Sequence, residues 1–273
     1  MSLLPTRDVL VDRFDGASTS GRDDTVVLEE PLEIRILGDT FAVTMRTPGQ
    51  DRELVIGLLF SEGILRSVDD IGTIAHCGRT GAEGRENTID VTPAPGRKLD
   101  LPDDLAGRRG TLTTSACGVC GRRSIDDLAL RCAPIALGAT LPRAVLTQAV
   151  ASLREAQPLF DKTGGCHAAT LVSYDGTRVA AFEDVGRHNA VDKVVGAMVL
   201  GRRLPLSEHI LVVSGRASFE LVQKAALAGI PVLASVSAPS SLAVDLARRT
   251  NVTLAGFVRG PTFNVYSAAG RLA

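Results

Sequence analysis

The cysteines Cys117 and Cys120 are the residues whose type and spacing point most directly to chemistry. Two residues separate them, a glycine follows each, and Arg122 and Arg123 come directly behind. Two thiols at this spacing can share a metal ion, exchange electrons by forming a disulfide, or carry sulfur as a persulfide. Which of the three applies largely decides what the protein does.

The composition of the 273-residue chain is that of an ordinary globular protein, with 45% hydrophobic and 22% charged residues. A net charge of −1 and the lack of Trp disfavour nucleic-acid binding. The longest apolar run, residues 54–60, is too short to span a membrane, and residues 1–20 lack the apolar region of a signal peptide. We therefore expect a cytoplasmic protein without nucleic-acid or membrane partners, whose Cys-x-x-Cys is catalytic or metal-binding.

The first half of the chain divides into three parts. Residues 1–24 are polar and predict a flexible start. Residues 25–112 predict a small α+β unit: a hairpin over 32–46 with its turn at Gly38-Asp39, a helix over 51–65, short strands near 71–77 and 87–91, and a linker over 93–110. Residues 113–124 carry the Cys-x-x-Cys among glycines and small polar residues, which indicates an exposed, mobile loop.

The second half, residues 125–273, has the pattern of an α/β domain. A helix over 142–157 precedes a hairpin over 170–182, and helices and strands then alternate to residue 257. Short connections between alternating strands and helices predict parallel strands with crossover helices. We therefore predict a mixed, mainly parallel sheet with helices on both faces.

Polar residues follow the strands of this predicted sheet. Ligands of open α/β sheets bind beyond the carboxyl ends of the strands, so these residues should share one rim. Arginines and helix amino termini together suit a phosphate or pyrophosphate group. The predicted rim contains Arg187, His188, Ser214, Arg216 and Arg259.

The residues alone leave the chemistry of Cys117 and Cys120 open. A closed zinc site needs two further ligands. Cys166 and His167 are the candidates, but adjacent residues rarely bind one ion together. The His-x-Glu and Pro-Cys-x-x-Cys signature of zinc deaminases is missing. A thioredoxin-like motif is expected early in a small domain, at a helix start, whereas this Cys-x-x-Cys follows the predicted linker. A persulfide carrier needs a thiolate, which the neighbouring arginines favour, and the second thiol can hold or release sulfur by closing a disulfide.

Several blocks of the sequence, in order, resemble those of the FdhD-type sulfurtransferases, accessory proteins of formate dehydrogenase maturation. The similarity covers about residues 29–267. The blocks are EEPL at 29–32, GLLFSEGI at 57–64, CGVCG at 117–121, TGGCHAA at 163–169, EDVGRHNAVDK at 183–193, SGRAS at 214–218, SVSAP at 235–239 and GF at 256–257.

The resemblance implies a sulfurtransferase with a persulfide intermediate. A cysteine desulfurase would load sulfur onto Cys117, with Cys120 as its partner thiol. The acceptor would be the molybdenum or tungsten bis-pyranopterin guanine dinucleotide cofactor, bound as a substrate, to which the protein adds the sulfido ligand that formate dehydrogenase needs. No structural metal is expected.

The resemblance also implies a fold, a cofactor segment and an oligomeric state. The second domain would be similar to the three-layer fold of cytidine deaminases without its zinc, and the protein would be a homodimer that binds GDP. The cofactor segment falls on Phe257, Val258, Arg259, Gly260, Pro261 and Thr262. Two alternatives are a non-catalytic cofactor chaperone and a zinc-binding Cys-x-x-Cys module.

Overall fold

The computed structural model describes residues 5–77, 87–101 and 132–273. Within these ranges the chain forms a two-stranded hairpin, a four-stranded sheet and a six-stranded sheet. The predicted loop 113–124, with Cys117 and Cys120, lies outside the described residues. None of the helices in the described ranges is long and apolar enough to cross a membrane.

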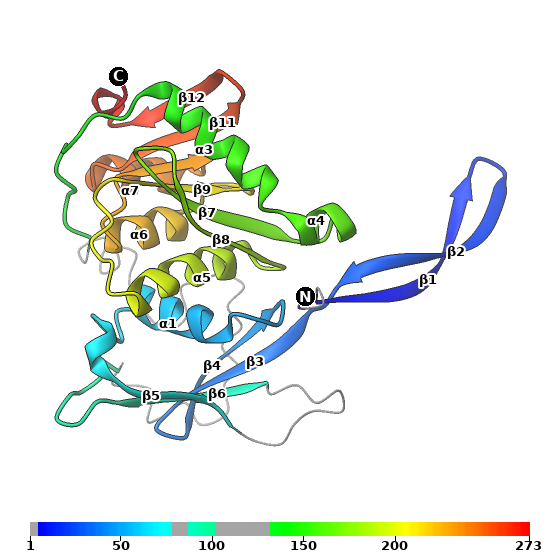
Figure 1. Cartoon of the computed structure of the whole chain (residues 1–273), viewed down its shortest axis with the longest axis horizontal. Helices are drawn as coiled ribbons and strands as arrows, with labels where there is room; N and C mark the ends of the chain where they lie inside the picture. Colours follow the sequence, from blue (N-terminus) through cyan, green and yellow to red (C-terminus); the bar gives the residue numbers. More distant parts are fainter. Residues whose placement is uncertain (1–4, 78–86, 102–131) are drawn as a thin grey trace.

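The first two strands form a long hairpin where the sequence predicted a flexible start. β1 (Thr6–Asp15) and β2 (Ser18–Val27) pair antiparallel over their whole length and extend away from the rest of the chain (Figure 1). Gly16 takes a φ of 59° in the two-residue turn, which is typical of a tight hairpin. The predicted flexible start was based on the polar composition of this segment. It overlooked β-branched residues such as Val9 and Val11, which favour an extended backbone.

The four-stranded sheet follows in the order β4-β3-β6-β5. Its antiparallel hairpin β3–β4 confirms the predicted one, and β6 pairs parallel with β3 and antiparallel with β5. A 3-10 turn, η1, precedes β5. The bounds are β3 (Glu30–Ile36), β4 (Asp39–Arg46), η1 (Val68–Asp70), β5 (Ile71–His76) and β6 (Thr88–Pro93).

Helix α1 (Asp51–Ser61) ends four residues before its predicted end. Gly63 has a φ of 69°, its N–H donates to the Phe60 carbonyl, and the Ile64 N–H donates to the Leu59 carbonyl, each at 2.9 Å. These paired bonds around a left-handed glycine are a Schellman motif, which satisfies the last carbonyls of a helix and stops it.

The six-stranded sheet has the order β12-β11-β10-β9-β7-β8 and confirms the predicted mixed α/β architecture. β9, β10 and β11 pair parallel, whereas β7 is antiparallel to both β8 and β9, so β8, β9, β10 and β11 run in one direction. The strands are β7 (His167–Ser173), β8 (Arg178–Asp184), β9 (His209–Val213), β10 (Val232–Ser235), β11 (Thr253–Arg259) and β12 (Thr262–Ser267).

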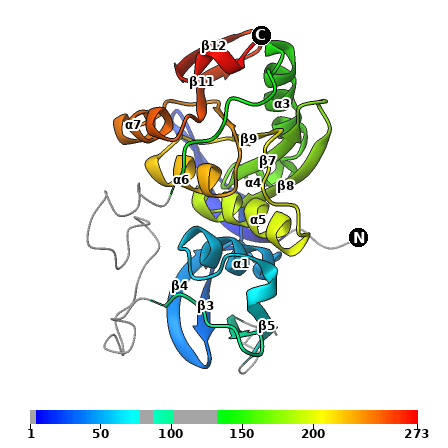
Figure 2. The same ribbon diagram turned by 90° about the vertical axis from the view of Figure 1, so that its left-hand side faces the viewer.

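Helices cover both faces of this sheet, as predicted. α3 packs on one face, and α5, α6 and α7 pack on the other (Figure 2). The helix bounds are α3 (Arg143–Glu155), α4 (Pro158–Thr163), α5 (Arg187–Leu200), α6 (Phe219–Leu227) and α7 (Ser241–Arg249), and a 3-10 turn η3 (Ala269–Arg271) closes the chain. The sequence did not predict α4 or β12, because each follows its predecessor after a break of only two residues.

Helices α1 and α5 join the two larger sheets through glycines. A Cβ atom on Gly57 would lie 1.9 Å from the backbone oxygen of Asp192, and one on Gly196 would lie 1.9 Å from that of Glu53. The two backbones therefore touch where no side chain fits. The largest hydrophobic core runs without interruption from the four-stranded sheet through α1 and α5 to the six-stranded sheet.

Candidate functional site

The loops at one edge of the six-stranded sheet lie next to one another. The Ala168 N–H donates to Ser214 Oγ at 2.9 Å, Ser235 Oγ donates to the Gly215 carbonyl at 2.6 Å, and the Phe257 N–H donates to the Ser237 carbonyl at 3.1 Å. These bonds connect the start of β7 with the carboxyl ends of β9, β10 and β11. We call the edge formed by residues 166–167, 184–187, 214–216, 235–239 and 257–259 the rim.

Most polar side chains of the 183–193 segment form hydrogen bonds or ion pairs with other parts of the fold. The carboxylate of Asp184 is fully buried, lies 2.7 Å from Lys193 Nζ and accepts from the Thr47 N–H at 3.2 Å. Lys193 also donates to the Thr47 carbonyl at 3.1 Å, and Asn189 Nδ2 donates to the Met45 carbonyl at 2.8 Å. These contacts fasten the loop after β8 to the end of β4.

A second buried ion pair involves Asp192, the residue directly before Lys193 on α5. Both carboxylate oxygens of Asp192 lie 2.5 Å from Lys224 Nζ on α6, and Ser61 Oγ on α1 donates to Asp192 at 3.1 Å. Burial raises the pKa of Asp192, although Lys224 acts in the opposite direction. The pair therefore links three helices beneath the rim.

His188, a predicted rim residue, contacts the start of α6. Its Nε2 lies 3.3 Å from Ser218 Oγ and 3.2 Å from a carboxylate oxygen of Glu220, both at the start of α6. Burial, together with the positive charges of Lys224 and Arg187, lowers the pKa of His188 to about 3. The imidazole is thus neutral, and it packs between the starts of α5 and α6.

Arg187 is the polar side chain of the 183–193 segment that the fold leaves available. Its Nε atom is buried and has no hydrogen-bond partner within the described ranges. Arg187 and His167 flank Gly215, since a Cβ there would lie 3.2 Å from His167 Nδ1 and 3.7 Å from Arg187 Cδ. Burial and the nearby Arg187 charge lower the pKa of His167, so this imidazole is neutral too. The exposed Arg216 follows directly.

The predicted cofactor segment forms the end of β11 and its turn into β12. Phe257 takes a left-handed φ of 53° beside a β-bulge and leaves 40% of its surface exposed. Val258 is 2% exposed and packs into the core under α3, so its side chain is withdrawn from the surface. Arg259, Gly260, Pro261 and Thr262 are exposed around the turn.

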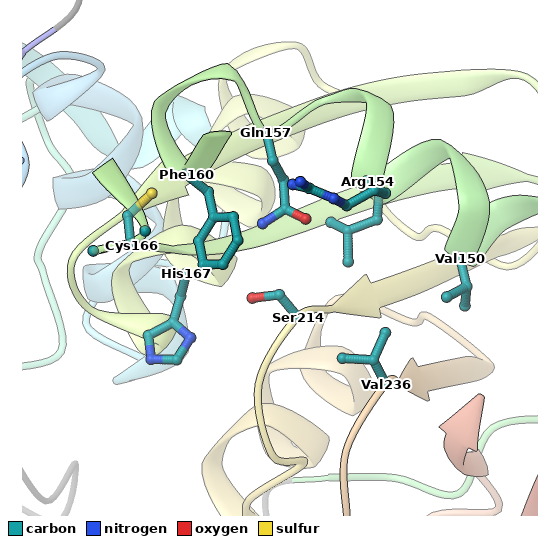
Figure 3. A pocket seen from close by; sticks show the side chains of 11 residues that line it. Val150, Arg154, Gln157, Phe160, Cys166, His167, Ser214 and Val236 are labelled. Atoms are coloured by element: carbon teal, nitrogen blue, oxygen red, sulfur yellow. The ribbon is translucent and has the colours of Figure 1, made fainter. Parts of the chain in front are cut away.

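A cleft of about 550 Å³ opens beside the rim, on the α3 side of the sheet. Figure 3 shows its walls, which come from α3, α4, the start of β7 and the ends of β9 and β10. Ser214 in its lining was predicted for the site, whereas Gln157, Phe160, Cys166 and His167 were not. The glycine pair before Cys166 is the sequence feature that could have indicated Cys166 and His167, because it lets the chain turn from α4 into the rim.

The thiol of Cys166 is poorly suited to nucleophilic chemistry. Cys166 is 6% exposed and donates to a Glu183 carboxylate oxygen at 3.3 Å. Burial, with the negative charge of Glu183, raises the pKa of this thiol far above its ordinary value. No group of three or more His, Cys, Asp or Glu residues that could hold a metal ion occurs in the described part of the chain. The reactive-cysteine prediction therefore rests on Cys117 and Cys120, which lie outside that part.

Comparison with known proteins gives the family. The model of the FdhD/NarQ family matches residues 27–273, and the chain belongs to this family. It is 54% identical over 255 residues to the sulfur carrier protein FdhD of Anaeromyxobacter dehalogenans strain 2CP-C, an alignment that covers 91% of this chain and 88% of the relative.

Two further relatives span nearly the whole chain. The sulfur carrier protein FdhD of Streptomyces coelicolor is 51% identical over 280 residues, covering 100% of this chain and 97% of the relative. A crystal structure of a candidate formate dehydrogenase accessory protein from Desulfotalea psychrophila superposes with a TM-score of 0.76 at 26% identity, covering 98% of this chain and 99% of the other. The predicted family resemblance is confirmed.

Proposed function

We propose that the protein is a sulfur carrier that supports formate dehydrogenase by transferring persulfide sulfur to a molybdenum or tungsten cofactor. The observation that carries this proposal is a Cys-x-x-Cys, Cys117 and Cys120, in a chain 51% identical along its full length to a protein named sulfur carrier protein FdhD. The related crystal structure, named for a formate dehydrogenase accessory role, supports the partner enzyme.

The sulfur steps follow from thiol chemistry. The Cys117 thiolate attacks the terminal sulfur of a cysteine desulfurase persulfide, takes that sulfur and releases the desulfurase thiolate. The Cys120 thiolate then attacks Cys117 Sγ, the sulfur–sulfur bond of the persulfide breaks, and the terminal sulfur leaves as sulfide for the metal. The two cysteines are left as a disulfide, which a dithiol reductant must reduce before the next cycle.

The rim is the proposed docking place of the acceptor, the bis-pyranopterin guanine dinucleotide cofactor. This substrate carries pyrophosphate groups, and the rim presents Arg187 and the exposed Arg216 next to Gly215. Arg259 stands on the adjoining β11–β12 turn. Guanidinium groups bind phosphate oxygens through charge-assisted, often bidentate hydrogen bonds. A homodimer remains part of the proposal.

Binding of GDP tests the rim. Arg216→Ala and Arg259→Ala should each weaken GDP binding by about 10- to 150-fold, because one charge-assisted bond is worth about 1.5–3 kcal/mol. Sulfur loading by the desulfurase should be unchanged in both variants. The matched control is Arg143→Ala, another exposed arginine, at the start of α3. Unchanged GDP affinity in both rim variants would remove the rim from the proposal.

The competing function is a cofactor chaperone whose thiols carry no sulfur. It predicts the same GDP binding, but a Cys117→Ala variant would still support full formate dehydrogenase activity. A zinc-binding module predicts stoichiometric zinc in the purified protein, which elemental analysis measures.

A further inference from the structure

The β1–β2 hairpin, residues 6–27, is an arm with which no other strand of the described ranges pairs. Its base is attached to the body: the Leu28 N–H donates to the Pro5 carbonyl at 2.9 Å, and Lys162 Nζ of α4 donates to Thr6 Oγ1 at 3.4 Å. From this base the arm extends away from the rest of the chain (Figure 1). Each strand of a two-stranded sheet leaves one edge of N–H and C=O groups unpaired, and such a hairpin is only marginally stable by itself.

The arm lacks several features that keep an open strand edge from pairing. Proteins protect such edges with short strands, prolines or bulges. The two strands of the arm are ten residues long, contain no proline and pair without a register shift, whereas the β3–β4, β5–β6, β7–β8 and β11–β12 pairs each contain at least one shift. Leu10 and Phe14 project from β1 with 78% and 75% of their surfaces exposed. A long, regular edge with exposed apolar side chains is a surface for a further strand.

The charges on β1 match a second copy of the same strand. When a strand pairs antiparallel with its own copy across a twofold axis, opposite residues lie on the same face of the sheet, and the residue on the axis defines the register. With Val11 on the axis, Arg7 lies opposite Asp15 of the second copy, and symmetry produces this pair twice. No like charges are directly opposite in this register.

The neighbouring registers bring like charges together. With Leu10 on the axis, Arg7 lies opposite Arg13 of the second copy. Asp8 then also lies opposite Asp12, and with Asp12 on the axis that residue lies opposite itself. Opposite charges across a sheet stabilise it and like charges destabilise it. The charge pattern of β1 therefore selects the register centred on Val11.

The same register also covers the exposed apolar side chains. Leu10 and Phe14 stand on the opposite face of the strand from Arg7, because side chains alternate along a strand. In this register Leu10 lies diagonal to both Leu10 and Phe14 of the second copy, at about 7–8 Å, which long and aromatic side chains can bridge. These four side chains form one apolar row across the junction, and the two Val11 side chains meet on the other face.

We propose that two copies of this chain associate through the outer edges of their β1 strands, in the antiparallel register centred on Val11, so that the two arms form one four-stranded sheet. The inference assigns a surface to the homodimer of the proposed function, on which it rests. Except for its last residue, the arm precedes residues 27–273, which match the family model. The surface is therefore separate from the rim and from the Cys-x-x-Cys.

Disulfide crosslinking of the full chain tests the register. Opposite residues of an antiparallel pair have Cβ atoms about 4.5–5.5 Å apart, close to the span of a disulfide. Val11→Cys should therefore give a covalent dimer when oxidised with diamide, which a reductant cleaves and peptide mass spectrometry locates at position 11 of both copies. Val9→Cys is the matched control, because its two copies would be more than about 13 Å apart in this register. The wild type, with its five native cysteines, gives the background.

An exchange of charges tests the same register without cysteine chemistry. Arg7→Asp and Asp15→Arg should each weaken the dimer about tenfold in sedimentation equilibrium, because each turns two opposite-charge pairs into like-charge pairs. The double variant Arg7→Asp/Asp15→Arg should restore the affinity of the wild type. Arg22→Asp is the matched control, since Arg22 is an exposed arginine on β2, away from the paired edge.

The possible results separate the arm surface from the proposed function. If Val11→Cys gives no covalent dimer above background while the wild type sediments as a dimer, the arm surface is wrong and the homodimer stands. A double charge variant that stays as weak as the single variants overturns the register and with it the proposal. A wild type that is monomeric at every concentration contradicts the homodimer as well, whereas sulfur loading of Cys117 is measured independently. If Leu10→Ser blocks that loading in a monomer, the open edge belongs to the desulfurase and the proposal is wrong.

Discussion

Replacing Gly196 with alanine should destabilise the protein, although alanine is the better helix former. Gly196 lies inside α5, where Gly→Ala alone is worth about 1 kcal/mol of stability. The new Cβ would lie 1.9 Å from the Glu53 carbonyl oxygen and 2.7 Å from the Gly57 nitrogen, both backbone atoms. Ordinary contact begins at 3.4 Å, so α1 and α5 must separate by about 1.5 Å.

The magnitude follows from these opposing effects. Overpacking of this kind costs about 3 kcal/mol, and the gain in helix propensity offsets about 1 kcal/mol of it. We therefore expect Gly196→Ala to lower the free energy of unfolding by about 2 kcal/mol, which is about 5 °C in Tm. The same separation lengthens the Ser61–Asp192 and Lys193–Thr47 hydrogen bonds beneath the rim, now 3.1 Å each.

Urea unfolding followed by circular dichroism measures the effect. Gly21→Ala is the control, because a Cβ atom added to Gly21 in β2 would meet no other atom within 4 Å and the residue has no strained φ. The reasoning is refuted if Gly196→Ala is as stable as the wild type or more stable, since the helices would then not be in backbone contact.

Three further predictions concern buried groups. Cys166 should resist iodoacetamide at pH 8 in the folded protein and react only on unfolding, as peptide mass spectrometry can follow, because burial raises the pKa of its thiol. Asp192→Asn should cost about 3–5 kcal/mol in urea unfolding, because it leaves Lys224 charged and 6% exposed; a loss below about 1 kcal/mol would contradict the buried pair. Burial lowers the pKa of His188 to about 3, so the unfolded chain binds the proton first and stability falls as pH drops below about 6.5. His188→Gln should therefore lose about 1–2 kcal/mol less than the wild type between pH 7 and pH 5, and equal losses would argue against a neutral buried imidazole.

The sequence was sufficient for the parts of the fold that depend on neighbouring residues. The β3–β4 hairpin has its turn at Gly38, and the alternation of strands and helices from β7 to β11 matches the prediction, because both follow from local periodicity. The adjacency of the loops after β9 and β10 also follows, since carboxyl ends of parallel strands meet at one edge.

What the sequence could not indicate are contacts between distant segments. Asp184 and Lys193 lie on either side of the predicted rim residues Arg187 and His188, yet both contact Thr47, more than 130 residues away. Gln157 joins the cleft because α4, a helix too short to show a clear periodicity, turns the chain back towards β7. Only the packing of α1 on α5 explains why Gly196 must be glycine.

The central claim is that Cys117 carries sulfur, and mass spectrometry of the intact chain tests it most directly. After incubation with a cysteine desulfurase and cysteine, we predict an adduct of about 32 Da on the peptide containing Cys117, which a thiol reductant removes. Cys117→Ala should fold normally, lack the adduct and fail to support formate dehydrogenase. A wild-type protein without the adduct, or a Cys117→Ala variant that retains it in full, would contradict the assignment.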